Sequence, residues 1–275
     1  MSADPNDILE FIEFRVGLGS AWETVSQDYR AIHDLYKFIR VRTDAEPAID
    51  PYVFEEIDLS KYNYQGGFNR KAIKADEVLL LFENFKHRRN RLMAYFAVGT
   101  GVRNSDIRTL RCSDVDYDIR IINITNPKNG NPYEVPISRE LANKLNRWQK
   151  SKGRKGYLSS RASEYMFPSQ QGRYIKTGEG FNKWVKEAAE RAGIQKVIGE
   201  STSVNTRDLR DRHRKEVHRV TVHTLRHTYV TLLQKAGVPP EARELMANHK
   251  SRQTTKIYEH YDKNWHDVVR TMLPF

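Results

Sequence analysis

Apolar residues recur at helical spacing along most of the chain, and this periodicity constrains the fold more than any other feature. From Lys74 onward two apolar groups follow one another, at 78–82 and at 92–97, and Gly99-Thr100-Gly101 breaks the second. The same spacing predicts further helices at both ends of the sequence. They are expected over residues 6–41 with a break at 17–19, and over 105–111, 138–152, 179–192, 223–236 and 239–247.

One region has the pattern of β-strands instead. Residues 119–125 are rich in β-branched side chains, and Tyr133–Ile137 alternates between apolar and polar positions. Asn129-Gly130 between them is a strong signal for a hairpin turn. We therefore expect a hairpin with Lys128 at its tip, and a mostly α protein with a small antiparallel β-sheet.

The charge is distributed unevenly along the 275 residues, whose formal net charge is +11. Residues 1–60 hold 5 Lys and Arg against 13 Asp and Glu, a balance of −8, whereas residues 61–275 have a balance of +19. Such a basic segment gains free energy by displacing counterions from phosphates, so nucleic acid is the expected partner. The glycine-containing stretch 62–67 is the best linker, which predicts domains at residues 1–68 and 69–275.

Several classes of protein are excluded by composition. Cys112 is the single cysteine, which rules out an internal disulfide framework or a cysteine-based zinc cage and suits a reducing cytoplasm. The longest apolar runs are far shorter than the ~18–20 residues of a membrane span. Asp4 and Asp7 stand where a signal peptide would have basic residues. We therefore expect a cytoplasmic location and no membrane partner.

Four short sequence motifs, called boxes below, stand in a fixed order along the chain. His223-Thr224-Leu225-Arg226-His227 begins a predicted helix, His249 follows, and Tyr258 stands nine residues later. Upstream, Arg103 lies in Thr100-Gly101-Val102-Arg103-Asn104-Ser105-Asp106-Ile107. This ordered set resembles the tyrosine recombinase (phage integrase) family over roughly residues 74–261. Each box alone is weak evidence, but the joint spacing is specific.

The resemblance implies a catalytic domain at 69–275, with a small helical, core-binding-like domain at 1–68. It implies an enzyme that cleaves and rejoins DNA through a 3′-phosphotyrosine intermediate, without metal or cofactor, to integrate or excise a mobile element, virus or plasmid. Its partners would be double-stranded DNA with specific sites and further copies of the chain, a tetramer on paired sites. A virus-borne enzyme would act in the host cytoplasm, and otherwise it would lie with the nucleoid. The implied catalytic residues are Tyr258, Arg103, Arg226, His223, His249 and Lys128.

The chemistry of these side chains supports the same interpretation. A phosphodiester under attack gathers negative charge on its non-bridging oxygens, which Arg103 and Arg226 could clamp without metal. A tyrosine hydroxyl, with an ordinary pKa near ~10, needs positive charge and a base, for which His223 and His249 are the available partners. The departing 5′ oxygen needs a proton, and in the family a hairpin lysine, here Lys128, delivers it.

Two alternatives stay open at the level of function. A type IB topoisomerase or resolvase would share this chemistry, and relaxation of any supercoiled plasmid would distinguish it. A non-catalytic DNA-binding regulator would retain the fold without forming a covalent adduct.

Other histidines and one acidic residue also need an interpretation. Asp106 fits the acidic position of the first box, and we expect it to support the structure. His213, His218, His223 and His227 are spaced like metal ligands, but no carboxylate or cysteine is placed to complete a site. We expect His227 to pack behind the active site instead.

Four features depart from the family pattern or extend it. Asn248 replaces the usual glycine before His249. The interval from Ile194 to His223 is unusually long and basic, and it is either a solvated helix or a contact with the DNA backbone. The acidic N-terminal segment either touches DNA through one basic face or contacts protein. That basic face would consist of Arg30, Lys37, Arg40 and Arg42.

The C-terminal tail predicts an amphipathic helix, either packed on its own domain or exchanged between copies of the chain. Its apolar face would consist of Trp265, Val268, Val269, Met272 and Leu273.

Overall fold

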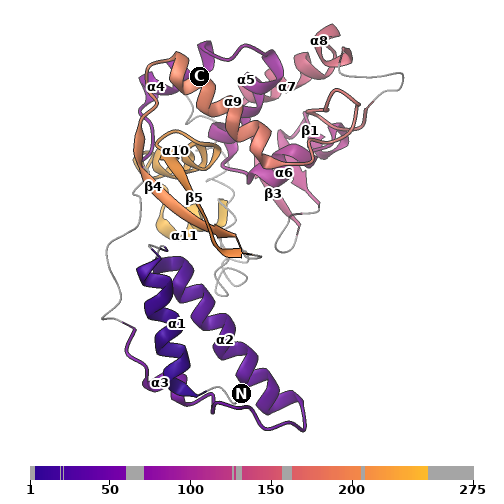
Figure 1. Cartoon of the computed structure of the whole chain (residues 1–275). Helices are drawn as coiled ribbons and strands as arrows, with labels where there is room; N and C mark the ends of the chain where they lie inside the picture. Colours follow the sequence, from indigo (N-terminus) through magenta and orange to yellow (C-terminus); the bar gives the residue numbers. More distant parts are fainter. Residues whose placement is uncertain are drawn as a thin grey trace. The chain divides into compact units, whose positions relative to one another are not determined.

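The computed structural model describes residues 4–18, 20, 22–59, 71–125, 127, 132–156, 163–205 and 208–246. Backbone contacts divide the chain into two compact units (Figure 1). The first joins Met1–Asn69 to Val197–Val217, and the second joins Arg70–Lys196 to His218–Phe275. The segment 197–217 thus groups with the N-terminal residues, although the sequence alone placed it in the second domain.

The first unit contains a pair of helices, α1 (Pro5–Gly17) and α2 (Trp22–Arg42), followed by the short α3 (Val53–Glu56). The Asp4 side chain accepts a hydrogen bond from the Asn6 amide, and that of Asp7 accepts one from the Asp4 amide. These bonds satisfy amides at the start of α1, where no helical partner exists. The apolar core of this unit consists of Ile8, Ile12, Val25, Tyr29, Ile49 and Phe54.

The second unit is built around the helix α5 (Arg88–Thr100). Every residue of α5 from Leu92 to Thr100 is buried, and α4, α6, α7, α9 and α10 all pack against it. The bounds of the other helices agree with the predicted ranges within a few residues, except that α8 follows the helix predicted over 138–152 and was not expected. They are α4 (Ala75–Glu83), α6 (Asn104–Thr109), α7 (Arg139–Gln149), α8 (Lys152–Lys155), α9 (Gly178–Arg191), α10 (Val222–Lys235) and α11 (Pro240–Met246).

A three-stranded antiparallel sheet adjoins this helical core. Its order is β1 (Val115–Asp116), β2 (Ile121–Ile124) and β3 (Tyr133–Pro136), with Ile122 opposite Val135. The predicted hairpin and the mostly α fold class are therefore confirmed, whereas β1 was not expected. Ile122, Ile124 and Val135 join the main core, so burial of one face fixes the register.

A second sheet lies in the long interval before α10. It pairs β4 (Val197–Asn205) with β5 (Asp208–His218), so the solvated-helix alternative is wrong. Most residues of β5 are charged, so the sequence lacks the alternation of apolar and polar residues that predicts a strand.

The described residues include no helix with the length and apolar character needed to cross a membrane.

Gly101 ends α5 in a conformation that a side chain would not tolerate. Its φ is +62°, the left-handed region, and a Cβ there would stand 2.2 Å from a ring carbon of Tyr229 on α10. The absence of a side chain at Gly101 therefore lets α5 and α10 approach closely.

Replacing Gly101 with alanine should destabilise the protein by at least about 2 kcal/mol, because backbone strain and the clash with Tyr229 add together. Gly193, with φ +69° and no atom within 4 Å of the place where a Cβ would stand, is the matched control. Gly193→Ala should cost only about 1 kcal/mol. Equal losses in urea unfolding would show that the approach to Tyr229 is unimportant.

Candidate active site

The starts of three helices converge on one open pocket of about 720 Å³ in the second unit. Residues at the beginning of α6, α9 and α10 form most of its wall. Because α9 and α10 are 14 residues long, their N-termini present partial positive charge to the pocket. The lining residues are Val102, Arg103, Asn104, Gly178, Glu179, Asn182, Thr221, Val222, His223 and Arg226.

Two arginines from segments far apart in the sequence meet in this pocket. Arg103 is the N-cap of α6, and Arg226 lies one turn inside α10, further from the helix start than the sequence suggested. Only 9% of the Arg226 surface is exposed, and its Nη1 donates a hydrogen bond to the Gly101 carbonyl. Burial lowers the pKa of Arg226, and the positive charge of Arg103 lowers it further. A bound anion would relieve this repulsion.

Hydrogen bonds fix the start of α10, where His223 is located. The Thr221 side chain accepts a hydrogen bond from the Thr224 amide, which caps the helix. Asn182, on α9, accepts a bond from the Val222 amide at 3.1 Å. These contacts hold the first turn of α10 against α9 and so set the direction in which His223 leaves the helix.

An ion pair anchors the segment just before α10. Arg219 donates to both carboxylate oxygens of Glu77 on α4, at 2.8 and 2.7 Å, and also to the Ile194 carbonyl. These hydrogen bonds hold the pKa of Glu77 below its usual range and raise that of Arg219. Arg219 belongs to the basic interval that was considered for DNA contact, but its guanidinium is committed to Glu77.

His223 and His227 lie on one exposed face of α10. Their Nε2 atoms are 3.0 Å apart and their ring centroids 4.5 Å apart. His227 is therefore exposed beside His223, and the expectation that it packs behind the site is wrong. Among the described residues, no group of three or more metal-ligating side chains comes together.

Asp106 lies beside the arginine pair and is almost completely buried, with 3% of its surface exposed. The Ser105 hydroxyl donates to its Oδ1 at 2.9 Å, and the Tyr133 hydroxyl donates to its Oδ2 at 3.2 Å. Its negative charge opposes the lowering of the Arg226 pKa. The Asp106 carboxylate thus links α6 to β3 through a hydrogen bond and acts on Arg226 of α10 through its charge.

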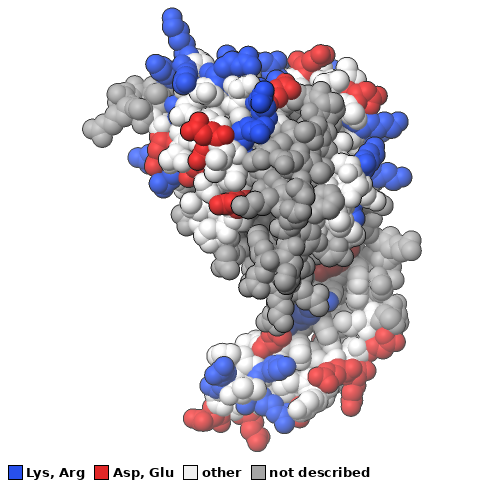
Figure 2. Space-filling model, turned by 180° about the vertical axis from the view of Figure 1, so that it is seen from behind, with Lys and Arg blue, Asp and Glu red and all other residues white. Residues whose placement is uncertain are grey.

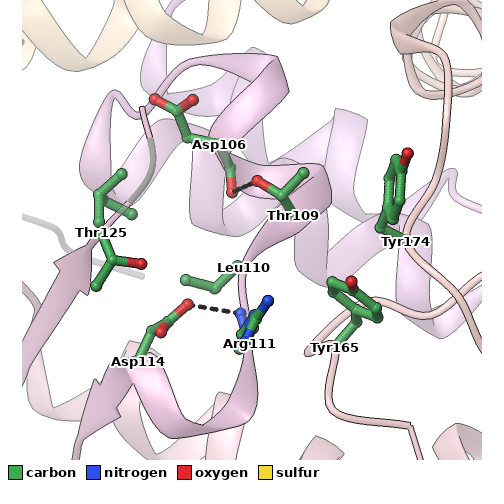
Figure 3. Close-up of a pocket in the computed structure, with 9 residues that line it drawn as sticks. Asp106, Thr109, Leu110, Arg111, Asp114, Thr125, Tyr165 and Tyr174 are labelled. Atoms are coloured by element: carbon green, nitrogen blue, oxygen red, sulfur yellow. Dashed lines mark hydrogen bonds between the residues drawn. The ribbon is translucent and has the colours of Figure 1, made fainter. Parts of the chain in front are cut away.

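A smaller pocket of about 200 Å³ adjoins Asp106 on another side (Figure 3). Tyr165 and Tyr174 stand together at one wall, and the Asp106 carboxylate lies on the side away from them. Asp114 opposite accepts a bond from the Arg111 amide, and burial raises its pKa. This pocket is distinct from the one that contains the two arginines.

The structure brings together Arg103, Arg226 and His223 of the predicted set. Lys128, His249 and Tyr258 lie outside the described residues, as do Asn248 and the tail helix. Sequence reasoning missed Glu77, Tyr133 and Asn182. In the sequence, Tyr133 is marked only as the first residue of a predicted strand, and Glu77 and Asn182 resemble ordinary helix residues.

The proposed basic face of α2 is only partly continuous. Arg30 and Lys37 are seven residues apart and share one side of the helix. Arg40 pairs with Asp50 and stacks on the Tyr52 ring, with 5.1 Å from its guanidinium carbon to the ring centre. A separate exposed apolar stripe, Ala31, Leu35, Phe38 and Val41, also runs along α2.

Charged side chains are unequally distributed between the two units. On the face in Figure 2, Lys and Arg are prominent on the larger body, with acidic groups among them. The N-terminal helices carry acidic and basic groups together. Over residues 1–60 of the sequence, acidic residues outnumber basic ones by 8.

A sequence model of the phage integrase family matches residues 71–264, which is more than half of the chain. The chain belongs to the phage integrase family. The resemblance inferred from its boxes is therefore confirmed, as is the expectation of a tyrosine recombinase at the level of family.

The relatives with similar sequences are named tyrosine recombinases. Tyrosine recombinase XerA of Thermococcus kodakarensis is 27% identical over 194 residues, 68% of this chain and 57% of that protein. XerA of Pyrococcus furiosus is 22% identical over 94% of this chain and 76% of its own length. XerD of Halalkalibacterium halodurans is 24% identical over 93% of this chain and 77% of its own length.

Solved structures share the fold. The Tn1549 transposon integrase, in complex with transposon right end DNA, matches with a TM-score of 0.67 and 16% identity over 96% of this chain and 83% of that one. A lambda integrase dimer bound to a core site matches with a TM-score of 0.63 and 16% identity, over 95% of this chain and 83% of that one. At these identities the likeness shows the fold alone.

Replacing Glu77 with glutamine should remove a pH-dependent part of the stability. Because the folded pKa is lowered, the ionised pair stabilises the protein above about pH 4.5, the ordinary value, and this is lost as the pH falls through the folded pKa. At pH 7 Glu77→Gln should cost about 1.5 kcal/mol in urea unfolding, a difference that shrinks below pH 4.

Glu187→Gln, which removes the partner of exposed Lys183 at 3.8 Å, is the control and should cost at most about 0.5 kcal/mol. A Glu77 variant as stable as the wild type at pH 7 would contradict the anchoring role of the pair.

Proposed function

We propose that this chain is a site-specific DNA recombinase that forms a 3′-phosphotyrosine intermediate and integrates or excises a mobile element, virus or plasmid. The observation that carries the proposal is the meeting of Arg103 and Arg226 in one pocket with His223. Two guanidiniums that repel each other, in a pocket to which helix N-termini add partial positive charge, suit the negative charge on the non-bridging oxygens of a phosphodiester in the transition state.

In the proposed reaction the Tyr258 hydroxyl oxygen attacks the scissile phosphorus. A bond forms between that oxygen and phosphorus, the bond from phosphorus to the 5′ oxygen breaks, and the tyrosine proton passes to a base. His223 or His249 accepts this proton or donates a hydrogen bond to the phosphate, and Lys128 protonates the departing 5′ oxygen. The 5′ hydroxyl of a partner strand reverses these steps, so the phosphotyrosine bond retains the energy needed for rejoining.

Two described tyrosines near the arginines suit the attack less well. The Tyr133 hydroxyl donates to Asp106, and Tyr229 is wholly buried, so that burial raises its pKa. A buried phenol with a raised pKa is a poor nucleophile and cannot reach a DNA strand. This supports Tyr258, which is assigned by the spacing of the family boxes.

The proposed partners are double-stranded DNA with specific sites and further copies of the chain, as a tetramer on paired sites. Residues 1–68 would form a core-binding-like domain and 69–275 the catalytic domain. The acidic N-terminal segment and the exposed stripe on α2 suit a contact with protein better than a broad contact with phosphates. The proposed location is the cytoplasm, with the nucleoid or in a host cell.

Replacing Tyr258 with phenylalanine should abolish the covalent protein–DNA adduct on a nicked suicide substrate, because the attacking oxygen is removed. Binding of the same DNA in a gel-shift assay should be unchanged. Tyr261→Phe is the neighbouring control and should still form the adduct. An adduct in the Tyr258 variant would refute this nucleophile, and wild-type protein that relaxes any supercoiled plasmid would favour a topoisomerase.

Replacing Arg210, Arg212 and Arg214 together with glutamine should make the affinity for DNA less dependent on salt concentration. If all three contact phosphates, the slope of log K against log salt should fall by about 2.7. Replacing Lys150, Lys152 and Lys155, on the exposed surface at α7 and α8, removes the same charge as a control. An unchanged slope, or an equal change in the control, would contradict a contact through β5.

A further inference from the structure

Tyr133 connects the hairpin to the arginine pair. It opens β3 opposite Ile124, the last described pair before the hairpin tip, and its side chain is half buried against the main core. Its hydroxyl donates to Asp106 on α6 at 3.2 Å. None of the boxes that identify the family includes Tyr133.

Asp106 is the group through which Tyr133 can act. A carboxylate that is 3% exposed needs hydrogen-bond donors, and Ser105 and Tyr133 each supply one to a different oxygen. Asp106 also lies close enough to Arg226 for its negative charge to oppose the lowering of the Arg226 pKa by burial and by Arg103. The carboxylate is therefore bonded to a neutral hydroxyl while a guanidinium within electrostatic reach can compete for it.

The position of Arg226 depends on how this competition is resolved. With Tyr133 bonded to Asp106, Arg226 donates to the Gly101 carbonyl and lines the pocket beside Arg103. Without the hydroxyl, we expect Asp106 to satisfy its free oxygen by drawing the Arg226 guanidinium toward itself. That movement would turn Arg226 away from a phosphate in the pocket.

We propose that Tyr133 is a positioning residue for DNA cleavage, which restrains the Asp106 carboxylate so that Arg226 remains directed at the scissile phosphate. This rests on the proposed function, since it concerns the same phosphate site. Tyr133 touches neither the phosphate nor the reacting atoms in this role.

The test is single-turnover strand cleavage by Tyr133→Phe at saturating protein on a nicked substrate. Loss of one hydrogen bond to a charged group should slow cleavage about tenfold, while the dissociation constant for DNA changes less than about twofold. Tyr174→Phe removes a hydroxyl from the smaller pocket and should cleave at the wild-type rate. Equal thermal midpoints for the variants would establish that all of them fold.

Two chemically altered substrates locate the defect. A methylphosphonate at the scissile position carries no charge that requires Arg226, so the wild-type and Tyr133→Phe rates should agree within about twofold. A bridging 5′-phosphorothiolate has a leaving group that needs no proton, so on it the defect should persist. Arg226→Ala should follow the Tyr133 variant on both substrates.

Other outcomes overturn the proposal. A defect erased by the phosphorothiolate would show that Tyr133 acts through protonation of the leaving group, and one equal on all substrates would show a merely structural role. Complete loss of cleavage in Tyr133→Phe that neither substrate restores would also contradict it. Failure of the wild-type protein to cleave any substrate would instead overturn the proposed function.

Discussion

The repulsion between Arg103 and Arg226 is the interaction on which the rest of this site depends. Two guanidiniums brought together in a partly buried pocket disfavour each other, and burial of Arg226 makes this worse. The surroundings hold Arg226 in place through the Gly101 carbonyl, the negative charge of Asp106 and the close packing of α5 against α10. The charge that remains is directed at the pocket, where a phosphate would neutralise it.

The fold supplies this support through contacts distant in sequence. Gly101 permits α10 to approach α5, and its carbonyl then receives Arg226. Arg219 ties the residues before α10 to α4, and Asn182 ties its first turn to α9. None of these residues need touch DNA. They place three side chains from two separate boxes in one pocket, which the boxes alone cannot do.

The sequence predicted the parts of the molecule that repeat a simple period. Helices with an apolar face, such as α7 and α9, and a hairpin with Asn129-Gly130 could be predicted because burial selects residues at fixed spacing. β5 was not, since its charged residues give no apolar period, and β1 is only two residues long. Arg103, Arg226 and His223 were found through the spacing of the boxes. Tyr133 and Glu77 were missed because their roles come from partners 27 and 142 residues away.

The most direct test of the account is to identify the residue that carries DNA after cleavage. Wild-type protein trapped on a nicked substrate would be digested with nuclease and trypsin, and the nucleotide-bearing peptide sequenced by mass spectrometry. We expect peptide 257–263, modified at Tyr258 rather than Tyr261 and joined to a 3′-phosphate. A nucleotide on another residue, or one joined through a 5′-phosphate, would contradict it.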